Sequence, residues 1–206
     1  MADKKFLDNA YGLDDEKAMH SFYADWAASY DAEIKENGYA TPRRCAEALA
    51  GLIPDLSAPI LDMGCGTGLS GIALRAAGFS TVDGSEPSDE MLAGARKLDG
   101  VYRQLIQTEL ETPLPFAPGT YAHIQAAGVI AAQHAPPETI DTALSVLPSG
   151  GCLVFSLNDH TMEDVSFPEK VDEVVANGTG MLLFREHGPH LPGIGLESTV
   201  FVLQKP

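Results

Sequence analysis

Three glycines alternate with other residues in the stretch LDMGCGTG, residues 61–68. Gly64, Gly66 and Gly68 remove every Cβ atom from one side of a loop, which costs conformational entropy. That cost is justified mainly where the chain turns sharply or where its backbone lies against a ligand. The spacing therefore raises the question of which ligand this backbone approaches.

The elements around the loop must be a strand before it and a helix after it. The apolar run PILDM predicts a strand, and LSGIALRAAG predicts a helix with Gly78 at its C-terminal end. A second unit follows, in which STVDGSE predicts a strand and SDEMLAGARKL a helix capped by Ser88. This alternation is typical of βαβ units.

The second half of the chain continues the alternation. Strands are predicted at VYRQLIQ, YAHIQAA, CLVFSL, MLLFREH and LESTVFVLQ, and helices at PPETIDTALSVL and PEKVDEVVANG. The segment SLNDHTMEDVSF is interpreted as a loop. Since a loop joins the last two strands, we expect a doubly wound, Rossmann-like α/β fold with about seven mostly parallel strands and an antiparallel edge strand.

Two helices are predicted before the glycine loop. The segment DDEKAMHSFYADWAASYDAEI has an amphipathic pattern, and TPRRCAEALAGLI begins with Thr41 as N-cap and Pro42 at the first helical position. We expect one domain over residues 1–206, with an N-terminal helical lid segment at 1–55 and the sheet core at 56–206.

Composition narrows the possible partners. The 206 residues are 45% hydrophobic and carry a formal net charge of −16, which repels phosphate backbones and anionic lipid. Three cysteines show no metal-ligand spacing, and no apolar run approaches the roughly 20 residues of a membrane span. We expect a cytoplasmic protein with a small-molecule partner, no nucleic acid, no membrane and no metal. The oligomeric state is not predicted.

Two ligand classes compete for the glycine loop. A nicotinamide or flavin dinucleotide favours G-x-G-x-x-G, to which GTGLSG fits only in part. The segment ILDMGCGTG instead resembles the glycine-rich loop of class I S-adenosylmethionine-dependent methyltransferases. The similarity extends from FYADWAASYD to LPSGG, and GFSTVDGSEPSDEML is similar to the small-molecule branch, including the Williams-Beuren-region methyltransferase-like group.

The resemblance implies S-adenosylmethionine as cofactor and gives the acids roles. Asp62 would orient the loop and reach the ammonium of the methionine moiety, directly or through water. Glu86 would accept both ribose hydroxyls, as acids do at the same place in dinucleotide sites. Asp83 competes for that role, but EPSDEML matches the family at Glu86.

Further contacts rest on the resemblance alone. Glu109 and Leu110, in QTELETPLPF, would bind the adenine, and Gly128 would border the transferable methyl group. Tyr23 and Tyr30 lie at helical spacing and are either core residues or contacts of the methionine end. The full set of predicted cofactor residues is Tyr23, Tyr30, Asp62, Gly64, Cys65, Gly66, Thr67, Gly68, Leu69, Glu86, Pro87, Ser88, Met91, Glu109, Leu110 and Gly128.

We expect few catalytic groups in the protein, because the sulfonium of S-adenosylmethionine already makes the methyl carbon electrophilic. His134, in the predicted loop after the fourth strand, is the candidate base. His187 and His190 could be drawn as a metal pair, but nothing nearby in the sequence completes a site. Three functions stay open: a small-molecule methyltransferase, an NAD(P)-dependent oxidoreductase, and a non-catalytic protein that binds S-adenosylmethionine or S-adenosylhomocysteine.

Overall fold

The computed structural model describes residue 34 and residues 36–108, 114–132 and 134–206 of the chain. In chain order its elements are α3 (Thr41–Ala50), β1 (Ile60–Met63), α4 (Leu69–Ala76), β2 (Val82–Glu86), α5 (Asp89–Ala95), β3 (Gln104–Gln107), β4 (His123–Ala126), α6 (Thr139–Val146), β5 (Cys152–Asn158), α7 (Asp159–Glu163), α8 (Ser166–Ala176), β6 (Met181–Leu191), η1 (Pro192–Ile194) and β7 (Leu196–Gln204).

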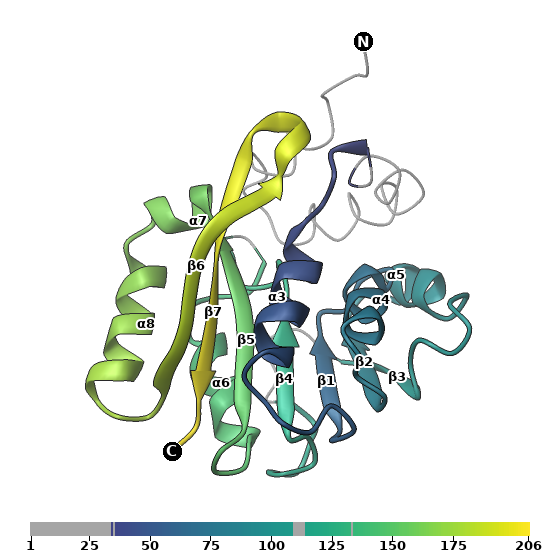
Figure 1. The fold of residues 1–206 in the computed structure, drawn as a ribbon, viewed down its shortest axis with the longest axis horizontal. Helices are drawn as coiled ribbons and strands as arrows, with labels where there is room; N and C mark the ends of the chain where they lie inside the picture. Colours follow the sequence, from purple (N-terminus) through teal and green to yellow (C-terminus); the bar gives the residue numbers. More distant parts are fainter. Residues whose placement is uncertain (1–33, 35, 109–113, 133) are drawn as a thin grey trace.

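The described strands form one seven-stranded sheet in the order β3-β2-β1-β4-β5-β7-β6 (Figure 1). Strands β1 to β5 pair in parallel, and β7 runs antiparallel to both β5 and β6. The prediction of a Rossmann-like α/β fold with antiparallel pairing at one end of the sheet is confirmed. The predicted strands and helices from β1 to β7 are present, and none of the described helices is long and apolar enough to cross a bilayer.

Helices cover both faces of the sheet, in agreement with the burial of consecutive residues along β1, β4 and β5. On one face, α3 and α4 pack over a cluster that includes Ile60 of β1 and Val154 of β5. On the other face, α6 and α8 pack over a cluster that includes Leu61 of β1 and Phe155 of β5. Asp62 therefore falls on the α3/α4 face of β1.

The strand order reverses between β1 and β4. From β1 the chain continues through β2 to β3 on one side, and then returns to place β4 on the other side of β1. Crossover connections therefore leave in opposite directions from the carboxyl ends of these two strands. In doubly wound sheets this switch point opens a crevice in which ligands bind.

Two local predictions were wrong. Ala40, not Thr41, is the N-cap of α3, and the Thr41 hydroxyl lies buried within 2.7 Å of His190 Nδ1, so a tertiary contact replaced the cap. The segment interpreted as a loop after β5 contains α7, which begins there because the Asn158 side chain accepts a hydrogen bond from the Thr161 N–H at 2.9 Å. All of the predicted helix over residues 14–34 except residue 34, and most of the predicted lid segment, lie outside the described residues.

Candidate active site

The glycine loop after β1 uses its three glycines for different purposes. All three have positive φ, at 67° for Gly64, 52° for Gly66 and 102° for Gly68. A Cβ atom on Gly64 would lie 2.5 Å from Val129 Cγ2, and one on Gly68 would collide with Leu98, so both positions are closed by the protein. A Cβ atom on Gly66 would meet no described protein atom within 4 Å. Gly66 therefore marks the open side of the loop, where a ligand can approach the backbone.

The acid after β2 is tied to this loop. Glu86 Oε2 accepts a hydrogen bond from the Gly66 N–H at 3.1 Å, and Oε1 accepts one from the Ser88 N–H at 3.0 Å. Ser88 in turn caps α5, since its hydroxyl accepts from the Met91 N–H at 3.2 Å, as predicted. Pro87 lies between Glu86 and Ser88, and its carbonyl oxygen accepts a hydrogen bond from the Gln107 side chain.

The second acid of β2 has a structural role. Asp83 is fully buried and accepts hydrogen bonds from Arg103 at 2.9 and 2.5 Å, from Gln104 at 2.7 Å and from Tyr121 at 3.0 Å. Burial alone would raise the pKa of Asp83, but these hydrogen bonds outweigh it and lower the pKa below its ordinary value. The carboxylate of Asp83 is thus occupied by protein donors.

Asp62 is buried near the carboxyl end of β1, directly before the glycine loop. Its carboxylate is fully buried, and Oδ2 accepts from Ser70 Oγ at 2.6 Å and from the Tyr102 hydroxyl at 2.7 Å. Among the described residues, no hydrogen-bond partner reaches Oδ1, nor Oε1 of Gln125, its register partner on β4. Burial raises the pKa of Asp62 to about 6, against the lowering effect of the Ser70 and Tyr102 hydrogen bonds. Through Ser70 and Tyr102 the carboxylate fixes the start of α4 after the loop.

The remaining loop residues face the protein. Cys65 and Thr67 are buried, and burial raises the pKa of the Cys65 thiol, so the thiol stays protonated and is no nucleophile. Leu69 begins α4 and packs against the cluster of Ile34, Leu191 and Leu196.

The loop after β4 completes the crevice. Gly128 has φ 72°, and its N–H donates to Ser156 Oγ at 2.9 Å. Its neighbour Val129 is the residue that closes the space beside Gly64, so the loops after β1 and β4 lie in contact. His134 follows in a turn in which its N–H donates to the Ala131 carbonyl at 3.1 Å, and its side chain is exposed.

Four predicted residues, Tyr23, Tyr30, Glu109 and Leu110, lie outside the described part of the chain. The structure brings the other predicted cofactor residues together at the carboxyl ends of β1, β2 and β4. Sequence reasoning missed Tyr39 and Ser156, both of which approach Gly128, because the turn before α3 and the end of β5 carry no motif.

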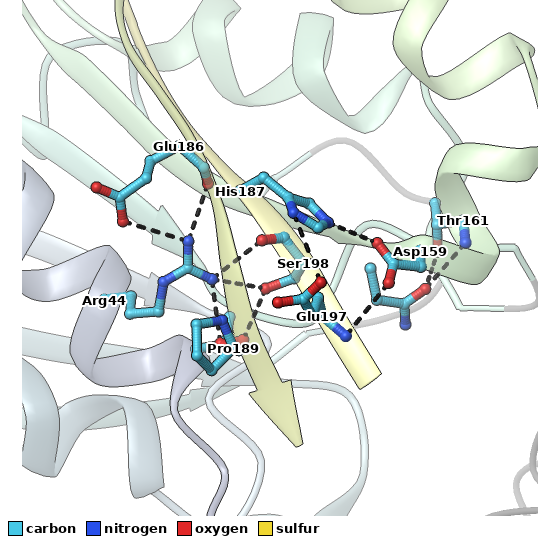
Figure 2. A network of polar contacts seen from close by, with 10 residues as sticks. Arg44, Asp159, Thr161, Glu186, His187, Pro189, Glu197 and Ser198 are labelled. Carbon is cyan, nitrogen blue, oxygen red and sulfur yellow. Dashed lines mark hydrogen bonds and ion pairs between the residues drawn. The ribbon is translucent and has the colours of Figure 1, made fainter. Parts of the chain in front are cut away.

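The two histidines of β6 do not form a pair. His190 is buried against Thr41, whereas His187 is exposed, with Nε2 at 2.9 Å from Asp159 Oδ1 and Nδ1 at 3.8 Å from Glu197 Oε2 (Figure 2). Among the described residues, one nitrogen of His187 and one oxygen each of Asp159 and Glu197 lie within 4.8 Å of one another, a spacing that could hold a metal ion. The carboxylates beside His187 thus come from other elements, Asp159 from α7 and Glu197 from β7.

Comparison with known proteins connects this geometry to one family. The profile of the family described as "Methyltransferase domain" matches residues 37–197. The human methyltransferase-like protein 27 is 33% identical over 159 residues, which cover 75% of this chain and 64% of that protein. The chain therefore spans about 64% of the length of this relative.

Solved structures share the fold. A SAM-dependent methyltransferase of Thermotoga maritima, described as a possible histamine N-methyltransferase, is 17% identical with a TM-score of 0.65, covering 89% of this chain and 98% of that one. The magnesium protoporphyrin IX methyltransferase of Synechocystis PCC 6803, solved with bound SAM, is 15% identical with a TM-score of 0.66, covering 94% of this chain and 98% of that one.

Proposed function

The chain belongs to the class I S-adenosylmethionine-dependent methyltransferases, and from that premise we propose that it transfers the methyl group of S-adenosylmethionine to a small-molecule acceptor. One observation carries the proposal: among the described residues, no atom fills the space where a Cβ atom of Gly66 would stand, directly beside the carboxylate of Glu86. The residues present fit the cofactor, because an open glycine and an adjacent acid suit a ribose that must lie close to the chain.

The residues that would hold the cofactor come from three strand ends. Gly64, Gly66 and Gly68 would form the backbone floor, Glu86, whose carboxylate holds the Gly66 and Ser88 N–H groups, would accept the ribose hydroxyls, and Gly128 would border the methyl group. Asp62 acts by holding Ser70 and Tyr102. When bound, S-adenosylmethionine supplies an electrophilic methyl carbon on a sulfonium.

The chain's own task is to position the acceptor and exclude water. An acceptor that is a hydroxyl or an ammonium must also lose a proton, and His134 is the proposed base because its side chain is exposed in the loop after β4. The net charge of −16 favours a small acceptor over a nucleic acid, and we place the protein in the cytoplasm without a metal requirement.

Thermal shift of the purified chain separates the candidate cofactors. S-adenosylmethionine and S-adenosylhomocysteine should raise the melting temperature, whereas NAD and NADP should not. Stabilisation by NAD or NADP alone would overturn the assignment in favour of an oxidoreductase. Formation of S-adenosylhomocysteine in a metabolite screen would then separate an enzyme from a non-catalytic binding protein, and its persistence in excess chelator would test the metal-free reaction.

A further inference from the structure

Tyr39 brings its hydroxyl to the end of β4. A Cβ atom on Gly128 would collide with this hydroxyl oxygen, so the phenol occupies the space that the glycine leaves open. Gly128 is itself held in place, since its N–H donates to Ser156 Oγ at 2.9 Å and its backbone has a φ of 72°. The contact between Tyr39 and Gly128 is thus built into a fixed piece of backbone.

The position of this contact is the switch point of the sheet. Gly128 follows β4, and the next residue, Val129, packs against Gly64 in the loop after β1. The Tyr39 hydroxyl therefore lies beside the crevice between the carboxyl ends of β1 and β4, where the strand order reverses.

The Tyr39 ring is oriented from behind by a buried polar chain. The His190 ring meets it edge to face, with ring centroids 5.2 Å apart and planes at 84°. His190 Nδ1 lies 2.7 Å from Thr41 Oγ1, which lies 3.0 Å from Ser198 Oγ, and Arg44 donates to that same Ser198 oxygen at 3.1 Å. Burial lowers the pKa of His190 to about 4, so the ring is neutral near pH 7.

The backbone on both sides of the Tyr39 side chain is also fixed. The Tyr39 N–H donates to the Ile34 carbonyl at 3.1 Å, and the Ala40 N–H donates to the His190 carbonyl at 2.9 Å. A side chain held by so many contacts loses little further freedom when it meets a ligand.

We propose that the Tyr39 hydroxyl faces the transferable methyl group, with His190 as the positioning residue that orients the Tyr39 ring. The inference rests on the proposed function, which puts Gly128 at the methyl end of the cofactor. A hydroxyl oxygen beside a sulfonium methyl accepts its polarised C–H groups and keeps the methyl in line with an incoming acceptor.

Isothermal titration with S-adenosylmethionine and S-adenosylhomocysteine tests this without an acceptor, because the two compounds differ only in the methyl group and its charge. Tyr39→Phe should weaken S-adenosylmethionine binding about two- to fivefold and leave S-adenosylhomocysteine binding unchanged. Tyr121→Phe is the matched control, because it also removes a tyrosine hydroxyl. Tyr121 lies just before β4, at the end of this strand opposite to Gly128, and its hydroxyl donates to Asp83.

His190→Gln should shift the affinity ratio in the same direction as Tyr39→Phe, and the double variant should show no further shift. An unchanged ratio in Tyr39→Phe, or an equal change in Tyr121→Phe, would overturn the assignment of Tyr39. Additive shifts in the double variant would overturn the role of His190. If the wild-type chain bound neither compound, the proposed function itself would fail, and this inference with it.

Discussion

The carboxylate of Glu86 accepts a hydrogen bond from the N–H of Gly66 at 3.1 Å, so the acid at the end of β2 is joined to the middle glycine of the loop after β1. The other oxygen of Glu86 holds the Ser88 N–H at the start of α5. One side chain thus sets the distance between the two loops that would bind the ribose. A change at Glu86 therefore acts on a ligand twice, by removing an acceptor and by releasing the loop.

Glu86→Ala should weaken S-adenosylhomocysteine binding by about 1–3 kcal/mol, because the ribose hydroxyls and the Gly66 N–H lose a charged acceptor together. Isothermal titration measures the effect. Asp89→Ala is the control, since this acid lies three residues away and pairs with Arg96 on the surface. Equal affinities for the wild type and Glu86→Ala would remove Glu86 from the site.

Gly66→Ala should reduce S-adenosylhomocysteine affinity more than tenfold, because the added methyl group fills the side of the loop that the protein leaves open. Its φ of 52° should also cost about 1–2 kcal/mol of stability. Gly100→Ala is matched to it, since Gly100 has φ 73° and equally open space around its Cβ position but lies after α5. Both variants should melt earlier by similar amounts, and only Gly66→Ala should lose the ligand. A parallel loss in Gly100→Ala would attribute the effect to stability alone.

Local pattern was sufficient to predict the strands, most helices and the glycine loop, because each is encoded by residues a few positions apart. The Ser88 cap and the turn at Gly78 follow from the same short range. Thr41 was assigned wrongly because its partner, His190, is 149 residues away. The contact of Tyr39 with Gly128 was missed for the same reason. The two residues are far apart in the sequence, and only the folded sheet brings the turn before α3 to the end of β4.

Asp62 should make stability depend on pH. Burial raises its pKa from an ordinary 3.8 to about 6, so between these values the folded chain binds more protons at this group than the unfolded chain does. The contribution of Asp62 to stability is therefore greatest below pH 4 and falls as the pH rises to about 6, by up to about 3 kcal/mol.

Asp62→Asn isolates this effect, because asparagine has the same shape and does not titrate. Urea unfolding of both proteins at several pH values from 4 to 7 should show that the stability cost of the substitution is larger at pH 4 than at pH 7. The other carboxylates titrate alike in both proteins and cancel in the difference. A cost that stays constant across this range would show that Asp62 ionises at its ordinary pKa.

Two consecutive arginines of α3 should differ sharply in their contribution to stability. The Arg44 side chain is only 9% exposed and donates to the carbonyl oxygens of Pro189 at 3.1 Å, Ser198 at 3.0 Å and Glu186 at 2.9 Å, which joins α3 to both β6 and β7 (Figure 2). The Arg43 side chain is 66% exposed, and among the described residues its only ion-pair partner is Glu47.

Arg44→Met should cost about 2–4 kcal/mol of unfolding free energy, because three carbonyl oxygens lose a charged donor whose own side chain is largely buried. Arg43→Met keeps the same change of side chain and should cost less than about 0.5 kcal/mol, since an exposed pair of this kind is largely screened by solvent. Urea unfolding gives both values, and hydrogen exchange of β6 should speed up only in Arg44→Met. Because α3 also carries Thr41 toward His190, loss of the Arg44 contacts should loosen the segment that holds Tyr39 at Gly128. Equal costs for the two variants would mean that β6 and β7 hold their place without α3.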